Sequence, residues 1–134
     1  MILDHIGIAV KDLGLSTALY TKILKNPPFK NESLASQKVN VSFFETGGNS
    51  KIELLEGTDE ESPIAKFVSK KGEGIHHIAF LVDDIYAEIE RLKSEGFEAI
   101  NEAPRVGADN KLVFFFHPKS TGGVLLELCQ KQKK

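Results

Sequence analysis

Apolar and polar residues alternate over several short segments of the first half of the chain, and this alternation predicts strands. In the opening segment Ile6, Ile8 and Val10 share one face, while His5 and small residues occupy the other. A Gly-Gly-Asn sequence at 47–49 is typical of a hairpin turn. The strands predicted for this half span 2–10, 29–35, 39–46 and 51–56, the second on the weakest pattern.

Helical periodicity follows the first strand. Leu15, Leu19 and Ile23 recur at four-residue spacing, which is typical of a helix with one apolar face, and an Asn-Pro-Pro sequence ends it. Ser62 followed by Pro63 indicates the N-cap and first turn of another helix. We therefore predict helices over 13–25 and 63–71, the second linking two halves of the chain.

The second half follows the same plan. Ile85, Ile89 and Leu92 form an apolar stripe in a predicted helix over 85–95, which Gly96 ends. The predicted strands of this half span 75–82, 97–101, 112–117 and 124–129. The expected fold is α+β, with two pseudo-symmetric β-α-β-β-β modules forming a cupped, eight-stranded mixed sheet.

An internal repeat supports this plan. Three blocks recur in the same order: 4–13 matches 76–85, 41–44 matches 113–116, and 51–55 matches 125–129, the last with two inserted residues. The chain is therefore interpreted as one domain, 1–134. Module 1 covers about 1–58, the linker helix about 62–72, and module 2 about 74–130.

The repeat gives each half a histidine on its first strand and a glutamate on its last: His5 with Glu53, and His77 with Glu127. Each glutamate lies between apolar neighbours, so its carboxylate faces the opposite side of the strand. Two imidazoles and two carboxylates suit Mn, Co, Ni, Zn or Fe(II) rather than Ca or Mg. We therefore predict one divalent ion held by these four residues, around which the sheet curves.

Composition narrows the possible partners and location. A net charge of −2 over 134 residues favours neither a nucleic-acid nor a membrane partner. Cys129 is the single cysteine, so no intrachain disulfide can form, which suits a reducing compartment. The N-terminus lacks the pattern of a signal peptide. The cytoplasm is the expected location.

With these residues in place, the chain resembles the vicinal oxygen chelate superfamily, which includes glyoxalase I, methylmalonyl-CoA epimerase, extradiol dioxygenases and antibiotic-resistance proteins. Four stretches are most similar to methylmalonyl-CoA epimerase: 4–10, 62–67, 74–80 and 117–128. The resemblance implies the same four metal ligands, an acyl-CoA substrate and a homodimer. Some epimerases have Gln where this chain has Glu53, and Glu there also fits the glyoxalase pattern.

The resemblance implies a role for two further residues, and the expected reaction adds two candidates for acid–base chemistry. Lys119 and Ser120 would lie near the acyl-CoA, although a polar hairpin turn explains Lys119 equally well. Epimerisation removes and returns a proton at C2, which requires an acid and a base. Glu127 is the first candidate base. Glu45, at the end of a central strand one hairpin from Glu53, is the candidate for the second.

Two other functions stay open at this stage. Glyoxalase I, lactoylglutathione lyase, needs the same metal and similar proton transfer. It would be favoured by an early arginine for the glutathione carboxylate, but none occurs before Arg91. A non-catalytic protein that binds a small ligand is the second alternative. A complete set of four ligands argues against it, since sequestration does not need one.

Overall fold

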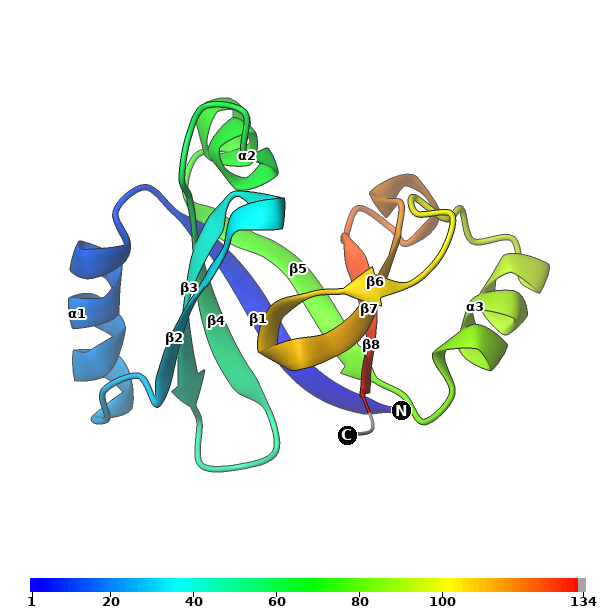
Figure 1. The fold of residues 1–134 in the computed structure, drawn as a ribbon, viewed down its shortest axis with the longest axis horizontal. Coiled ribbons are helices and arrows are strands. Elements are labelled where there is room, and N and C mark those ends of the chain that lie inside the picture. Colours follow the sequence, from blue (N-terminus) through cyan, green and yellow to red (C-terminus); the bar gives the residue numbers. More distant parts are fainter. Residues whose placement is uncertain (133–134) are drawn as a thin grey trace. The chain divides into compact units, whose positions relative to one another are not determined.

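A computed structural model describes residues 1–132 (Figure 1). Eight strands are present in this range: β1 (Ile2–Val10), β2 (Lys30–Leu34), β3 (Val39–Glu45), β4 (Lys51–Gly57), β5 (Gly74–Leu81), β6 (Arg105–Val106), β7 (Lys111–Phe116) and β8 (Leu126–Lys131). Three α-helices accompany them: α1 (Leu13–Leu24), α2 (Pro63–Lys71) and α3 (Ile85–Ser94). The α+β class and the order β-α-β-β-β in each half are confirmed.

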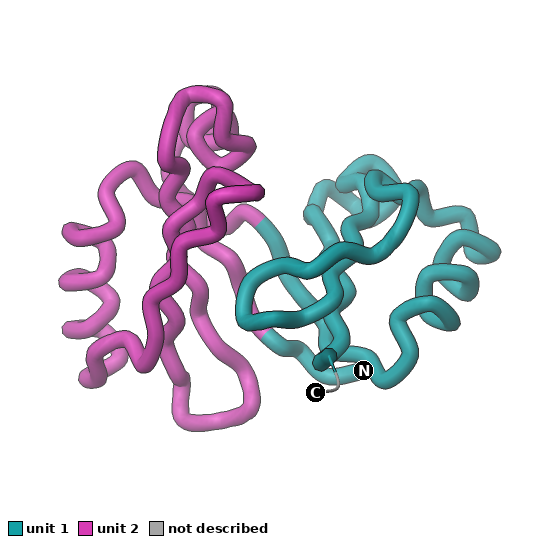
Figure 2. The backbone as a smooth tube through the Cα atoms, viewed as in Figure 1, with its two compact units in different colours: residues 1–4, 77–134 teal, residues 5–76 magenta. Residues whose placement is uncertain are grey.

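The chain divides into two compact units (Figure 2). One comprises residues 5–76, and the other comprises residues 1–4 together with 77–134. The chain therefore passes from one unit to the other within β1, after Asp4, and returns within β5, after His76. Whether the two modules act as one domain stays a prediction.

In the unit of residues 5–76 the strand order is β2-β3-β4-β1. β1 runs parallel to β4, whereas β3 runs antiparallel to β4 and β2. α1 packs on one face of these strands, where Val10, Phe44 and Leu54 form a buried cluster. His5 and Glu53 lie on the other face of these strands, which α1 does not cover.

The apolar stripe predicted for α1 is wrong. Leu15, Leu19 and Ile23 are exposed by 73%, 55% and 59%, and the cluster under the helix is contacted instead by Leu13, Tyr20 and Leu24. Residues spaced by four drift about 40° around a helix at each step, whereas the eleven residues from Leu13 to Leu24 return to within about 20°. Leu13, Tyr20 and Leu24 therefore lie within about 40° of one another around the axis and form one stripe, which contacts the strands. Asp12 caps this helix by accepting from the Leu15 N–H.

In the other unit the strand order is β5-β8-β7-β6, with β5 parallel to β8. α3 packs on one face through Ile85, Ile89 and Leu92, so its predicted stripe is confirmed. These side chains meet fully buried Phe114 and Leu128. The opposite face carries His77 and Glu127 beside a smaller buried cluster of Ala79, Val113 and Cys129. In both units the histidine–glutamate pair therefore lies on the strand face away from the helix.

The strand predicted over 97–101 is wrong. Only an isolated bridge between Ala99 and Phe116 forms there, and the short β6 pairs with β7 instead. The side chain of Asn101 accepts the Phe115 N–H at 2.8 Å, where a continuing strand would offer a backbone carbonyl. Pro104, which has no N–H to donate, follows soon after. Local side-chain chemistry thus ends the pairing after one bridge.

The helices within residues 1–132 are all too short or too polar to cross a bilayer.

Candidate metal centre

The first histidine–carboxylate pair lies in the unit of residues 5–76. In the parallel register of β1 and β4, Gly7 is the partner of Glu53, and His5 lies two residues earlier on the same face of β1. His5 Nδ1 lies 3.1 Å from Glu53 Oε2, and the two side chains are only 5% and 4% exposed. The two side chains are therefore in contact and shielded from solvent, as two ligands of one metal ion would be.

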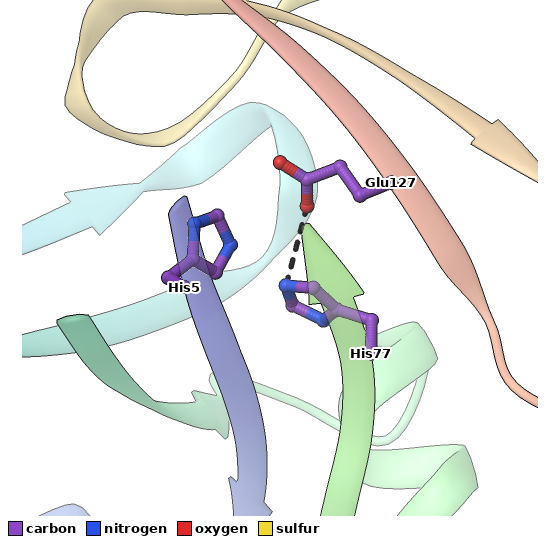
Figure 3. Close-up of side chains that lie close together, drawn as sticks. All are labelled: His5, His77 and Glu127. Atoms are coloured by element: carbon purple, nitrogen blue, oxygen red, sulfur yellow. Dashed lines mark ion pairs between the residues drawn. The ribbon is translucent and has the colours of Figure 1, made fainter. Parts of the chain in front are cut away.

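The second pair repeats this geometry in the other unit. Ala79 on β5 is the register partner of Glu127 on β8, with His77 two residues before it. His77 Nε2 lies 3.2 Å from Glu127 Oε1, and both side chains are 6% exposed. The dashed line in Figure 3 joins these two residues; the view also labels His5, on β1.

The surroundings of the two glutamates are equivalent. Each faces a small residue on the parallel neighbour, Gly7 or Ala79, and a phenylalanine on the antiparallel neighbour, Phe43 or Phe115. The small residues leave space beside the carboxylate. The Phe115 ring stands edge-on to the His77 ring, with centroids 6.0 Å apart. The sequence repeat is thus a repeat of site geometry.

The donor set of these pairs fits a divalent transition metal. Ligand bonds to such ions are about 2.0–2.2 Å long. Two ligands at right angles would then lie about 3.0 Å apart, close to the 3.1 and 3.2 Å observed within the pairs. A hydrogen bond has a similar length, so either interaction can hold each pair together. A buried carboxylate is costly unless a cation or donor compensates it, and both pairs provide that compensation.

Glu45 lies apart from these buried pairs. It ends β3, is exposed, and is the register partner of Lys51 on β4. It lies two residues beyond Phe43, the partner of Glu53, and so shares the strand face of that carboxylate. Glu45 therefore lies at the end of β3 on the strand face of Glu53, in an exposed position, and its role as second base stays a prediction.

Lys119 and Ser120 belong to a short turn, Pro118–Ser120, that follows β7. Lys119 is exposed, and its backbone N–H donates to His117 Nδ1. Ser120 Oγ donates to the His117 carbonyl and accepts the Glu98 N–H at 2.9 Å. The serine hydroxyl therefore holds the segment after α3 against the turn, while the lysine is open to a ligand.

A buried ion pair escaped prediction from the sequence. Lys111 Nζ lies 3.0 Å from both carboxylate oxygens of Asp4, and both residues are at most 5% exposed. Burial lowers the pKa of Lys111, but the hydrogen bonds and charge of Asp4 outweigh it, so the pKa is raised above its usual value. A lysine at the start of a strand gives no sequence signal of such burial.

Comparison with known proteins places these features in context. A family model described as Glyoxalase/Bleomycin resistance protein/Dioxygenase superfamily matches residues 4–115. The uncharacterized protein YqjC of Bacillus subtilis is 41% identical over 128 residues, covering 96% of this chain and 91% of that protein.

Two other relatives are epimerases by name. An ethylmalonyl-CoA/methylmalonyl-CoA epimerase of Cereibacter sphaeroides is 42% identical over 130 residues and 96% of each chain. Among solved structures, a variant of the Streptomyces coelicolor methylmalonyl-CoA epimerase in complex with 2-nitronate-propionyl-CoA superposes with a TM-score of 0.91. That structure is 34% identical and covers 99% of each chain.

Proposed function

Because the chain belongs to the glyoxalase/bleomycin resistance/dioxygenase superfamily, we propose that it is an isomerase that epimerises methylmalonyl-CoA at C2. The observation that carries the proposal is the pair of equivalent, buried histidine–glutamate contacts in a chain that resembles epimerases over nearly its whole length. The solved relative that binds an acyl-CoA analogue supports the substrate class.

We propose that His5, Glu53, His77 and Glu127 hold one divalent ion, with Co, Mn, Ni or Zn the candidates. Support comes from the matched burial, ligand type and spacing of the two pairs. When bound, such an ion would supply Lewis-acid stabilisation of the negative charge that develops when a proton leaves C2.

The proton itself is moved by residues of the chain. Glu127 is the proposed first base, because its carboxylate is buried beside His77 and projects from the strand face that α3 leaves uncovered. A second group must act on the opposite face of C2 to invert the centre. Glu45 is the proposed second group, supported by the strand face that it shares with Glu53.

The acyl-CoA is proposed to bind beside the turn of Lys119 and Ser120. An exposed lysine next to the glycine pair 122–123, whose backbone has positive φ, suits a phosphate or carboxylate. By resemblance the protein is also proposed to be a homodimer. Light scattering should then give about twice the 14.8 kDa mass of one chain.

The test combines metal stoichiometry with proton exchange. Metal-stripped protein is titrated with Co²⁺, and deuterium incorporation from solvent at C2 of methylmalonyl-CoA is followed by NMR. The hemithioacetal of methylglyoxal and glutathione serves as a parallel substrate. We expect one Co²⁺ per chain and exchange with the CoA ester only, which stops when the ion is removed.

Each other outcome has its own meaning. Two ions per chain would indicate that each pair binds alone and would contradict the four-ligand site. Turnover of the hemithioacetal alone would replace the epimerase with lactoylglutathione lyase. Tight Co²⁺ binding with neither reaction would indicate a non-catalytic binding protein.

A further inference from the structure

The buried ion pair between Asp4 and Lys111 lies next to a proposed metal ligand along the chain. Lys111 donates at 3.0 Å to each carboxylate oxygen of Asp4, and Asp109 adds a third oxygen at 3.5 Å. Asp109 adopts a left-handed backbone conformation with φ 58°. Aspartate adopts this conformation more readily than most residues other than glycine, so Asp109 suits the turn that leads into β7.

The ion pair lies where the chain passes from one compact unit to the other. Asp4 is the last residue of β1 that belongs to the unit of residues 77–134, and His5 is the first that belongs to the other unit (Figure 2). His5 in turn contacts Glu53 within its own unit. One peptide bond therefore joins a residue fixed by Lys111 to a residue fixed by Glu53.

The chain changes unit a second time between His76 and His77, and the contacts there follow the same plan. His76 is the last residue of the unit 5–76, where its ring meets the Phe67 ring edge-on at 4.9 Å. The next residue, His77, contacts Glu127 in the other unit. At both crossings, then, the residue before a ligand histidine is anchored in one unit and the histidine is paired in the other.

The other module of the repeat has no equivalent of this ion pair. In the repeat, the positions equivalent to Asp4 and Lys111 are His76 and Val39, so the other module has an apolar residue in place of the lysine. Val39 is buried as fully as Lys111. Since well-packed apolar residues are often at least as stabilising as a buried ion pair, stability does not explain why this module has charges there.

We propose that Asp4 and Lys111 are positioning residues that orient His5 as a metal ligand beside Glu53. This rests on the shared metal site of the proposed function. Because Lys111 donates to both carboxylate oxygens of Asp4, the pair would act through the chain and not as a ligand. It would limit the movement of the peptide bond through which His5 is attached.

The test uses a double variant, Asp4→Asn with Lys111→Met, which removes both charges and leaves neither buried alone. Its matched control is Glu88→Gln with Arg91→Met, which removes an exposed ion pair on α3 in the same unit. For each protein we would measure the thermal midpoint of the metal-free form, the Co²⁺ dissociation constant and the visible absorption spectrum of bound Co²⁺.

We expect the double variant to keep a metal-free midpoint within a few degrees of the unmodified chain. Its Co²⁺ dissociation constant should rise about 10- to 100-fold, the usual effect of losing a residue that orients metal ligands. Its cobalt spectrum should change, because the ligand geometry relaxes. The control should match the unmodified chain in all three measurements.

Unchanged cobalt affinity and spectrum in the double variant would overturn the proposal, whether or not its midpoint falls. If that variant does not fold, Asp4→Asn alone, which preserves size and hydrogen bonding, takes its place with the same outcomes. An unmodified chain that binds Co²⁺ without exchanging C2 protons would refute the epimerase and leave this inference standing. An unmodified chain that binds no Co²⁺ would refute both.

Discussion

Replacing Glu127 by glutamine should have opposite effects on the metal-free and metal-bound protein. The carboxylate is buried 3.2 Å from His77. Glutamine has nearly the same shape but carries no charge, so the metal-free variant avoids the cost of burying a carboxylate. Its stability should therefore equal or exceed that of the unmodified chain. The metal-bound variant, by contrast, loses one of the proposed ligands.

The size of the effect follows from binding linkage. Metal at 100 times its dissociation constant stabilises a protein by about 2.7 kcal/mol. Loss of a residue that only supports a ligand already weakens binding about 10- to 100-fold, so loss of a ligand should weaken it by at least about 100-fold. At the same metal concentration the variant would then gain only about 0.4 kcal/mol. For 134 residues, each kcal/mol shifts the thermal midpoint by roughly 3–5 °C.

The assay is differential scanning calorimetry with and without Co²⁺. We expect the ion to raise the midpoint of the unmodified chain by roughly 8–13 °C and that of Glu127→Gln by no more than roughly 1–2 °C. Deuterium exchange at C2 should be lost in the variant. Glu90→Gln, the same change at an exposed position on α3, should behave like the unmodified chain.

The reasoning is refuted if Glu127→Gln retains the full cobalt-induced shift, because the residue would then not be a ligand. A metal-free variant that melts several degrees lower would also contradict it. That result would mean that the charged contact with His77 stabilises the fold more than burial of the carboxylate costs.

Three further changes test the packing and electrostatics. Phe114→Ala should lower the free energy of unfolding, measured in urea, by about 3–5 kcal/mol, because the ring is fully buried in the cluster under α3. Tyr86→Ala, at a position 59% exposed, should change it by less than about 0.5 kcal/mol. Gly57→Ala should lower the free energy of unfolding by about 1–3 kcal/mol, since the new Cβ would lie 2.7–2.9 Å from atoms of Ser62 and Ala65, at the N-cap and in the first turn of α2. A Cβ at Gly48 would have no atom within 4 Å, so an equal loss in Gly48→Ala would contradict this. Because the pKa of Lys111 is raised in the folded state, its ion pair stabilises fully below pH about 10.5 and is lost as pH rises through the higher folded value. The stability difference between the unmodified chain and Lys111→Met should therefore shrink in alkaline urea titrations, and a difference that stays constant to pH 12 would show that the charge is not involved.

The sequence alone determined the repeated architecture and the composition of each histidine–glutamate pair. Strand alternation and helix periodicity are local properties, so they located seven of the eight strands and all three helices close to their observed bounds. The two histidine–glutamate pairs followed from the repeat, because equivalent positions in duplicated modules occupy equivalent places. Contact within each pair was therefore foreseeable from pattern and spacing.

Tertiary structure decided which face of a helix is buried and where strand pairing stops. In α1 more than one set of apolar residues has helical spacing, and Leu13, Tyr20 and Leu24 are the set that contacts the strands. After α3, the side chain of Asn101 replaces a backbone acceptor and ends the pairing. Neither outcome is encoded in the periodicity of a single segment.

The buried pair of Asp4 and Lys111 shows this limit most clearly. The two residues are 107 positions apart, and each alone looks like an ordinary surface charge. Only the folded unit brings them within 3.0 Å and excludes water, which makes each charge depend on the other. Sequence pattern thus specified the chemistry offered on each strand, whereas long-range packing decided which charges became buried and paired.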